Sequence, residues 1–489
     1  MFNEYYINII ENTTGKKFDT FNRSSSNVID EIIEQYKNHH SILLIKEKLR
    51  QDSNFNTFQI PLCKEPDIYN IILKMNIKAS QGWDKIPAKI LKTCAHIISE
   101  PLSQIINQSI EKGIFVDTGK IALVTPLYKN PKAGSRQDIS HYRPLSVLTS
   151  FSKIFERYYL DSMLNHVNKI LDKHISAYRK GHSCQHVLLK LTEEWRKHMD
   201  QNKIVGGLLM DLSKAFDCLP HELLIAKLAA YGFEEATLNL LYSYLKNRKQ
   251  AVKINGIFSD FLEILSGVPQ GSILGPILFN IFMNDFIYQL EETPVDDYNF
   301  ADDNTLSACA ENVSDLKIKL EHGATEALKW LTSNNMIANP DKFKAIILKK
   351  ASIDCNSHIA IKVGDQLIEP TSSVNLLGLE IDDKLNFRNY IKEMCRKAGA
   401  KLNAIKRLQC ILDEKERKIL VDAHVTSQFN YCSTVWHFCG LSEIHKMEKL
   451  HERAIRFIYN EQSKAYFDIL KENKITTLYG RRANTGHVY

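Results

Sequence analysis

Two short apolar segments of this chain run directly into carboxylates, and they constrain its fold more than any other feature. Residues 204–210 form an uninterrupted apolar and glycine run, typical of a buried strand, and Asp211 closes it. Residues 298–306 place Asp302 and Asp303 between aromatic and β-branched residues, a pattern typical of two strands joined by a turn. Because an unpaired charge at the end of a buried strand is costly, we expect a cation beside Asp211.

Helical and strand-like segments are mixed along the chain without regular alternation. Apolar residues recur at helical spacing in residues 84–94, 102–114 and 152–167, whereas residues 121–128 are typical of a short buried strand. Because no strict βαβ repeat is visible, the pattern predicts an α+β fold and not a doubly wound parallel sheet.

The composition is that of an ordinary globular protein. Of the 489 residues, 44% are hydrophobic and 25% are charged, which excludes a disordered chain and predicts two to four domains. The net charge of +6 permits a polyanionic partner without requiring one. The ten cysteines form no CxxC pair and follow no signal peptide, so we expect reduced thiols and an intracellular protein. No apolar run approaches the roughly 18 residues of a transmembrane helix, so we expect no membrane partner.

Residues 391–409 predict a helix with an apolar stripe and a basic face. The stripe consists of Ile391, Met394, Cys395, Ala398, Leu402, Ile405 and Leu408. The basic face consists of Lys392, Arg396, Lys397, Lys401, Lys406 and Arg407, with Glu393 as its single acid. Two interpretations are open: a solvated surface, or a helix that lies along nucleic-acid phosphates.

The three carboxylates also have two interpretations. An Asp-Asp turn is usually a solvated loop, and a strand-end Asp commonly caps a helix. Alternatively, Asp211, Asp302 and Asp303 converge on divalent cations, since Mg²⁺ prefers oxygen ligands and retains water.

Longer sequence blocks surround these acids. They are residues 211–217 (DLSKAFD), 266–276 (SGVPQGSILGP) and 300–303 (FADD). In this order and at these separations, the blocks resemble reverse transcriptases of non-LTR retrotransposons, most closely the jockey-like kind. Further matches are residues 78–87, residues 142–146 with Lys153 and Glu156, residues 339–342, and residues 377–378 with Asp382. The resemblance spans about residues 78–460.

The resemblance implies an RNA-directed DNA polymerase that extends a DNA primer on an RNA template with deoxynucleoside triphosphates. Asp211, Asp302 and Asp303 look like its catalytic, metal-binding triad, which would hold two Mg²⁺ ions or, as a substitute, Mn²⁺. Two such ions about 4 Å apart can activate a 3′-hydroxyl and stabilise the leaving pyrophosphate. Many reverse transcriptases have Tyr before the Ala of the last block; this chain has Phe300, as non-LTR relatives also do.

The resemblance also assigns residues to the nucleotide. Phe216 looks like the steric gate that excludes a 2′-hydroxyl, although most Phe residues are simply core aromatics. Lys129 and Arg143 flank a polar hairpin loop, which we expect to be mobile, and look like contacts to the β- and γ-phosphates. Lys342 resembles the lysine proposed to protonate the leaving pyrophosphate.

The block from residue 266 to 276 supplies the expected contacts to the templating pair. Gln270, together with Gly271, resembles the residues that hold this pair and the incoming nucleotide. As glycines, Gly267 and Gly271 would let the backbone approach a base pair closely. By contrast, Cys432, His437, Cys439 and His445 fit no standard zinc-finger spacing, and we predict no zinc.

The implied fold is a right-hand polymerase with a helical N-terminal extension. Its predicted parts are the extension (1–77), the fingers (78–203), the palm with the catalytic carboxylates (204–350), a primer-grip-like segment (351–385) and a helical thumb with a truncated C-terminal region (386–489). The palm would carry a helical insertion after Pro220. The basic helix, through Lys392, Arg396, Lys397 and Lys401, would lie on the template–primer duplex, held by phosphates and shape and not by base edges.

Related full-length proteins typically carry an endonuclease domain before the polymerase, and residues 1–77 are too few for one. The sequence therefore predicts an element fragment or a separately encoded remnant without nicking activity, located in cytoplasm and nucleus. Two alternatives stay open. One is a decayed or co-opted copy that binds RNA or primer–template without polymerising; the other is an intron-encoded reverse transcriptase, although no maturase-type segment is evident.

Overall fold

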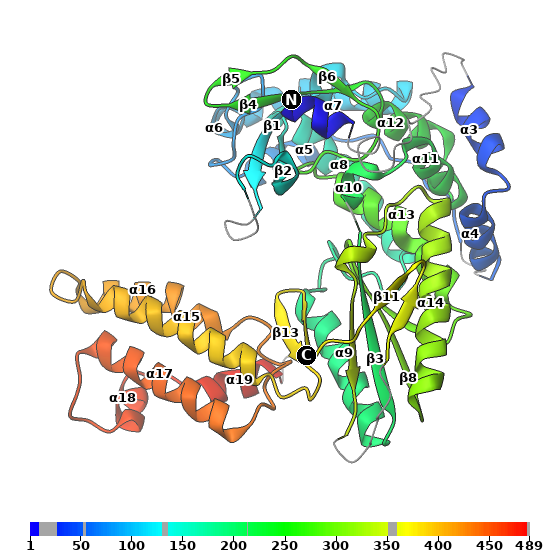
Figure 1. Cartoon of the computed structure of the whole chain (residues 1–489). Coiled ribbons are helices and arrows are strands. Elements are labelled where there is room, and N and C mark those ends of the chain that lie inside the picture. The colour runs from blue at the N-terminus through cyan, green and yellow to red at the C-terminus, as the bar shows by residue number, and fades with distance from the viewer. Residues whose placement is uncertain (9–26, 52–54, 130–134, 213, 351–358, 487–489) are drawn as a thin grey trace. The chain divides into compact units, whose positions relative to one another are not determined.

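Helices and strands are mixed throughout the computed structural model of the chain (Figure 1). It describes residues 1–8, 27–51, 55–129, 135–212, 214–350 and 359–486. The α+β prediction is confirmed. Within the described residues, no helix is both long and apolar enough to cross a bilayer, and the nine cysteines found there form no disulfide.

The chain divides into two compact units, each built from separate stretches of sequence. Unit 1 comprises Met1–Tyr178, Leu212–Glu292 and Thr325–Asn339. Unit 2 comprises Arg179–Asp211, Thr293–Ala324 and Pro340–Tyr489. The predicted extension, fingers, palm and thumb follow the chain linearly, and their spans stay predictions.

Unit 1 contains a five-stranded sheet in the order β2-β1-β4-β5, with β6 paired to β4. The strands are β1 (Ile121–Tyr128), β2 (Tyr142–Val147), β4 (Arg248–Ile254), β5 (Ile257–Phe258) and β6 (Leu262–Ile264). β1 begins and ends where the sequence predicts. It runs antiparallel to β2 and parallel to β4, so the loop after Tyr128 closes a hairpin, as expected.

Unit 1 also contains helices, many of which pack on one another. They are α1 (Phe2–Ile7), α3 (Val28–Tyr36), α4 (His40–Arg50), α5 (Glu65–Lys74), α6 (Ala88–Thr93), α7 (Ala95–Lys112), α8 (Ser150–Ile170), α10 (Ala215–Cys218), α11 (His221–Ala230), α12 (Glu235–Leu245) and α13 (Gly275–Leu290). The three predicted helices correspond to α6, α7 and α8. α13 is mostly apolar and is almost entirely buried, including its polar residues Asn280, Asn284 and Asp285, so it forms the centre of the core. α11 and α12 are the helices predicted after Pro220, and their assignment as an insertion in the palm stays a prediction.

Unit 2 contains a four-stranded antiparallel sheet in the order β7-β8-β3-β9. Its strands are β3 (Ile204–Asp211), β7 (Asp296–Phe300), β8 (Asp303–Ala310) and β9 (Lys344–Leu348). α9 (Cys184–Asp200) and α14 (Val313–Ser333) cover opposite faces of the sheet. Adjacent residues of a strand point to opposite faces, and Gly206 and Gly207 of β3 face different helices. A Cβ on Gly206 would lie 2.6 Å from Leu320, and one on Gly207 would lie 2.8 Å from Trp195. These two glycines therefore let both helices pack closely.

The C-terminal part of unit 2 combines two small hairpins with helices. The hairpins are β10 (Ile361–Val363) with β11 (Gln366–Ile368), and β12 (Ser373–Leu376) with β13 (Leu379–Asp382). The helices are α15 (Arg388–Lys406), α16 (Glu414–His424), α17 (Leu441–Tyr459), α18 (Tyr466–Glu472) and α19 (Leu478–Gly486). Asp382 accepts hydrogen bonds from the backbone N–H groups of Asn386 and Phe387, at 3.2 and 2.6 Å, and so fixes the start of α15.

α15 confirms the predicted amphipathic helix, with one correction. Ile391, Met394, Ala398, Leu402 and Ile405 are buried in the core of unit 2, and Cys395 is half-buried. Leu408 does not belong to the buried stripe, since it is 44% exposed. The helix ends at Lys406, so the helical spacing on which the prediction depended stops before residue 408.

Candidate active site

A tight hairpin presents two of the predicted carboxylates in unit 2. β7 and β8 pair from Phe300 opposite Asp303, so Ala301 and Asp302 form a two-residue turn. Ala301 adopts a positive φ of 59°, as such turns require. Asp302 and Asp303 are both exposed. The predicted strand, turn and strand are therefore present, with the acids at the tip.

Asp211 is the last residue of β3, as predicted, and its cross-strand partner on β8 is Asp303. Side chains directly opposite each other on an antiparallel pair share one face, with Cβ atoms about 5 Å apart. The fold thus brings together two carboxylates that are 92 residues apart in the printed numbering. Like charges at this separation repel each other, and a cation is expected beside them.

Lys342 is the cation beside Asp211. Its Nζ lies 3.6 Å from Oδ2 of Asp211, and the two side chains are 58% and 42% exposed. The β3–β9 register explains this contact, because it pairs Leu209 with Lys344 and so brings residue 342 opposite residue 211. The expectation of a cation beside Asp211 is confirmed.

An open cavity of about 470 Å³ adjoins this group within unit 2. Its polar lining residues are Asp211, Asp303, Asn304, Asp341, Lys342, Lys344 and Asn375. Asp302 is not among the residues that line it, since it lies in the turn. The cavity can admit an anionic ligand beside two lysines and place it against the carboxylates.

The carboxylates fit a cation that also takes ligands from water and substrate. Among the residues that the structure describes, no three His, Cys, Asp or Glu side chains form a metal-binding group. Asp211 and Asp303 therefore offer an open pair and not a complete protein shell. Mg²⁺ is usually bound in this way, by one or two carboxylates together with waters and substrate phosphates.

The residues predicted to contact the nucleotide sugar and the templating pair lie in unit 1. Phe216 is half-buried. Its ring stacks on Phe279 with 4.3 Å between the ring centroids, and it lies edge-on to Tyr178. These ring contacts show that Phe216 packs partly against its protein neighbours. Its role as a steric gate stays a prediction.

Gln270 contacts a carboxylate to which the sequence assigned no role. Its Nε2 donates to Oδ1 and Oδ2 of Asp217, at 2.8 and 2.9 Å. Burial raises the pKa of Asp217 to about 6, although Gln270 and the nearby cations Lys214 and Lys129 act in the opposite direction. The sequence offered one signal, since Asp217 closes the block of residues 211–217, but it did not show that the side chain faces Gln270.

Two glycines allow this loop to approach neighbouring backbone. Gly267 and Gly271 have φ values of 78° and 129°. A Cβ on Gly267 would lie 2.6 Å from the carbonyl oxygen of Asp217, and a Cβ on Gly271 would overlap the carbonyl oxygen of Ser146. The close approach that these glycines permit in unit 1 is to the protein itself, and the approach to a base pair stays a prediction.

Lys129 and Arg143 lie at the loop end of the β1–β2 hairpin, and both are exposed. The backbone N–H of Lys129 donates to the carbonyl oxygen of His141 at 2.9 Å, which extends the hairpin by one step. Part of the loop between them, residues 130–134, lies outside the described residues, so its predicted mobility stays a prediction. The arrangement projects two cations from one end of a sheet.

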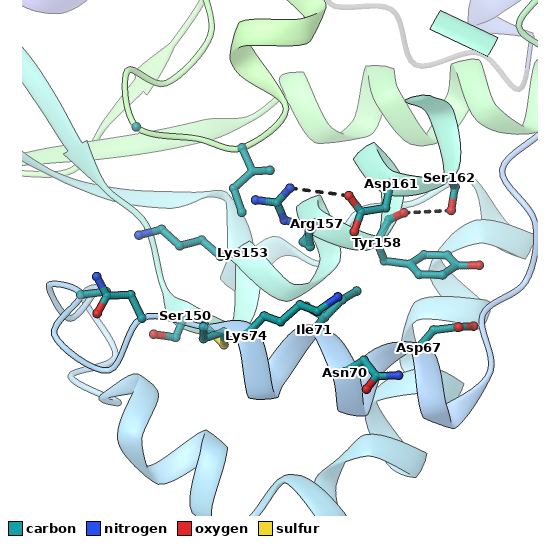
Figure 2. A pocket seen from close by; sticks show the side chains of 15 residues that line it. Asp67, Asn70, Ile71, Lys74, Ser150, Lys153, Arg157, Tyr158, Asp161 and Ser162 are labelled. Carbon is teal, nitrogen blue, oxygen red and sulfur yellow. Dashed lines mark hydrogen bonds and ion pairs between the residues drawn. The ribbon is translucent and has the colours of Figure 1, made fainter. Parts of the chain in front are cut away.

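A second concave surface of unit 1, with a volume of about 1000 Å³, carries cations that the sequence did not single out. Figure 2 shows Lys74 from α5, and Lys153 and Arg157 from α8, among its lining side chains. Gly271, from the loop that carries Gln270, also lines it. We call this surface the α5–α8 groove. Lys153 belonged to a sequence match, and Arg157 follows it by one helical turn in α8. Lys74 carried no signal, because it becomes their neighbour only in the fold.

The basic face of α15 is exposed. Lys392, Arg396, Lys397 and Lys401 are exposed, and Lys406 is half-buried. Arg407, predicted on the same face, is exposed but follows the end of the helix at Lys406. Arg396 donates to both carboxylate oxygens of Glu393, at 2.6 and 2.7 Å. Because Arg396 and Lys397 stabilise its charge, the pKa of Glu393 falls to about 2.

Comparisons with known proteins assign this chain to a family. Residues 130–381 match the family described as reverse transcriptase (RNA-dependent DNA polymerase), which covers more than half of the chain and includes Asp211, Asp302 and Asp303. A similar curated protein is the RNA-directed DNA polymerase from mobile element jockey of Drosophila melanogaster. It is 26% identical over 332 residues, which are 66% of this chain and 36% of that protein.

Two further relatives cover more of the chain. The RNA-directed DNA polymerase from mobile element jockey of Drosophila funebris is 25% identical over 85% of this chain and 46% of its own length. The probable RNA-directed DNA polymerase from transposon X-element of Drosophila melanogaster is 21% identical over 91% of this chain and 47% of its own length. The chain thus spans less than half the length of each of these relatives. The predicted resemblance is confirmed: the chain belongs to the reverse transcriptase (RNA-dependent DNA polymerase) family.

Proposed function

We propose that this chain is the RNA-directed DNA polymerase of a non-LTR retrotransposon, which extends a primer 3′-hydroxyl on an RNA template. The observation that carries the proposal is the β3–β8 register, which pairs Asp211 with Asp303 beside an open cavity, inside the family match. Relatives named as RNA-directed DNA polymerases from mobile elements support it.

Reverse transcriptases generally use divalent metal ions. In the proposal, Asp211, Asp302 and Asp303 would hold two Mg²⁺ ions, with Mn²⁺ as a possible substitute. When bound, such ions activate the attacking hydroxyl and neutralise charge on the leaving pyrophosphate. The two-residue turn supports this arrangement, because it joins Asp302 directly to Asp303, the cross-strand partner of Asp211.

The remaining site residues of the proposal act on the nucleotide. Lys342 donates a proton to the leaving pyrophosphate, and its contact with Asp211 places its ammonium group beside the metal ligands. Lys129 and Arg143 bind the β- and γ-phosphates, for which their projection from one hairpin end is suitable. Phe216 excludes the 2′-hydroxyl, and Gln270 with Gly271 holds the templating pair.

Two surfaces support a nucleic-acid partner. Lys392, Arg396, Lys397 and Lys401 would contact the phosphates of the template–primer duplex along α15. The α5–α8 groove would hold unpaired template, since its lining includes Gly271, the chain neighbour of Gln270. Within the described part of the chain, the side-chain ammonium groups of Lys74 and Lys153 form no hydrogen bond or ion pair, so their charges are available to phosphates.

The proposal includes a right-hand arrangement, with the fingers, palm and thumb at the spans given above. The sheet that carries Asp211 would be the palm, and α15 would belong to the thumb. The enzyme would act in the cytoplasm and nucleus, where its RNA template and its DNA primer are found.

Primer extension tests the proposed function. Wild-type protein is compared with Asp302→Ala, Asp303→Ala and the double variant, on an RNA template with a DNA primer, Mg²⁺ and deoxynucleotides. Asp365→Ala is the matched control, because it also removes an exposed acid from a hairpin turn, the turn between β10 and β11. Binding of the primer–template is measured for every protein.

We expect extension by the wild type and by Asp365→Ala, and none by the double variant, with primer–template binding retained throughout. Binding without extension by the wild type would instead identify a decayed or co-opted copy. Extension by the double variant would show that Asp302 and Asp303 are not needed for polymerisation.

A further inference from the structure

The hydrogen bonds between Asp217 and Gln270 dictate which end of the Gln270 amide faces outward. A carboxylate only accepts hydrogen bonds, so the amide nitrogen of Gln270 must face Asp217. The amide oxygen, Oε1, then points away from Asp217. A protonated carboxyl group or an amide at position 217 could also donate a hydrogen bond. The Gln270 amide could then face it with either its nitrogen or its oxygen.

The backbones that carry both side chains are fixed independently. Ser266 Oγ donates to the carbonyl oxygen of Asp217 at 3.0 Å. The backbone N–H of Val268 donates to the carbonyl oxygen of Phe216 at 2.9 Å, and that of Ser146 donates to the carbonyl oxygen of Gln270 at 2.8 Å. The orientation of the Gln270 amide is therefore the remaining variable, and the Asp217 carboxylate controls it.

This inference rests on the proposed function. We propose that Asp217 is a positioning residue: its carboxylate holds the Gln270 amide in the one orientation that recognises a correctly paired deoxynucleotide. Asp217 acts through Gln270 and does not itself touch the nucleotide. The residue thereby connects the strand-end block that carries Phe216 with the loop that contacts the templating pair.

The charges around Asp217 make this control dependent on pH. Lys214 and Lys129 favour the carboxylate, and Tyr6 and Cys218, whose pKa values burial raises, are neutral neighbours near pH 7. Because burial raises the pKa of Asp217 to about 6, its carboxyl group is ionised at pH 7.5 and largely protonated at pH 5. Amide orientation should thus be fixed above pH 6 and lost below it.

The test compares wild type with Asp217→Asn, which keeps the size of the side chain but lets the Gln270 amide reverse. Ser266→Ala is the matched control, because it removes a neighbouring hydrogen bond to the same residue without changing the carboxylate. We expect Asp217→Asn to raise KM for the paired deoxynucleotide about tenfold at pH 7.5 with a much smaller change in kcat. Lowering the pH to 5.5 should raise KM for wild type and Ser266→Ala but not for Asp217→Asn.

A double-mutant cycle separates positioning from a structural effect. In a Gln270→Met background, Asp217→Asn should have no further effect on KM, because the group through which it acts is gone. An unchanged KM, a loss confined to kcat, or an undiminished effect in the Gln270→Met background would overturn the inference.

Binding of the next deoxynucleotide to a complex with a dideoxy-terminated primer, in Mg²⁺, gives a readout that needs no catalysis. If the wild type binds but does not extend a normal primer, the proposed polymerase function fails, while weaker binding by Asp217→Asn still supports the positioning role. Equal binding by both proteins, or no binding by the wild type, would overturn that role.

Discussion

Lys342 Nζ lies 3.6 Å from Oδ2 of Asp211, across the edge where β3 and β9 pair. The two residues are 131 positions apart in the numbering, and the antiparallel register brings them together. The pair combines a group that can donate a proton with a carboxylate that can hold a metal ion.

Replacing Lys342 tests whether it donates a proton or only pairs with Asp211. We expect Lys342→Ala and Lys342→Arg both to lower kcat by about 10²-fold or more, because an arginine keeps the charge but is a poor acid. Lys344→Ala, which removes the other lysine of the cavity, is the control and should change kcat little. Single-turnover extension measures the effect. Full activity of Lys342→Arg would show that charge alone is needed.

The α5–α8 groove predicts a dependence on template length. With wild-type protein, affinity for a primer–template should rise as the unpaired 5′ template extension lengthens. The variant Lys74→Ala plus Lys153→Ala should lose this increase while its affinity for a blunt duplex stays unchanged. Lys46→Ala plus Lys89→Ala removes two exposed lysines outside the groove as a control. An equal loss of affinity for blunt duplex would show that these lysines attract nucleic acid in general and do not bind the unpaired template.

The basic face of α15 predicts a change in salt dependence. Lys392→Ala plus Lys401→Ala should reduce the slope of log affinity for duplex against log salt by about 2, because each phosphate contact releases about one counterion. Arg396→Ala should change the slope less, since Glu393 already accepts two hydrogen bonds from Arg396. Fluorescence anisotropy at several salt concentrations measures both slopes. A solvated surface without a partner would leave all slopes equal.

Removing one partner of a fully buried ion pair should strongly destabilise unit 1. Lys227 Nζ lies 2.6 Å from Oδ1 of Asp285, with neither side chain exposed, and Oδ2 of Asp285 accepts from Trp330 Nε1 at 2.7 Å. Lys227→Met should lower the free energy of unfolding by about 3–5 kcal/mol, because it leaves a buried carboxylate unpaired. Adding Asp285→Asn should restore most of it, since the amide oxygen still accepts from Trp330. Denaturant unfolding measures the stability of the single and the double variant. An equal loss of stability in the two variants would contradict an electrostatic cause.

Unit 2 should lose stability on acidification through His451. This side chain is 2% exposed, and burial lowers its pKa to about 4. In the unfolded chain His451 takes up its proton near pH 6.5, so its contribution is complete above that pH and is lost as pH falls toward 4. The loss corresponds to about 3 kcal/mol at most. Denaturant unfolding between pH 7.5 and 4 should show a shallower decline for His451→Leu than for wild type, whereas exposed His424→Leu should follow wild type.

Local sequence patterns determined the elements that position the candidate site. The apolar run before Asp211 predicted β3, the residues around Asp302 and Asp303 predicted the β7–β8 hairpin, and the amphipathic spacing predicted α15. These predictions succeeded because strand and helix periodicity are properties of neighbouring residues. The ordered blocks of sequence likewise identified the reverse transcriptase family, because each block is a continuous run of residues.

Tertiary structure decided the contacts between residues far apart in the chain. The pairing of Asp217 with Gln270 spans 53 positions, and the burial of Lys227 against Asp285 spans 58. Neither leaves a periodic signal, because a hydrogen bond between distant segments depends on how their backbones approach in space. The same reason explains Lys74, which becomes a neighbour of Lys153 only when α5 packs beside α8. Sequence alone thus determined the elements and the family, whereas packing decided which side chains meet.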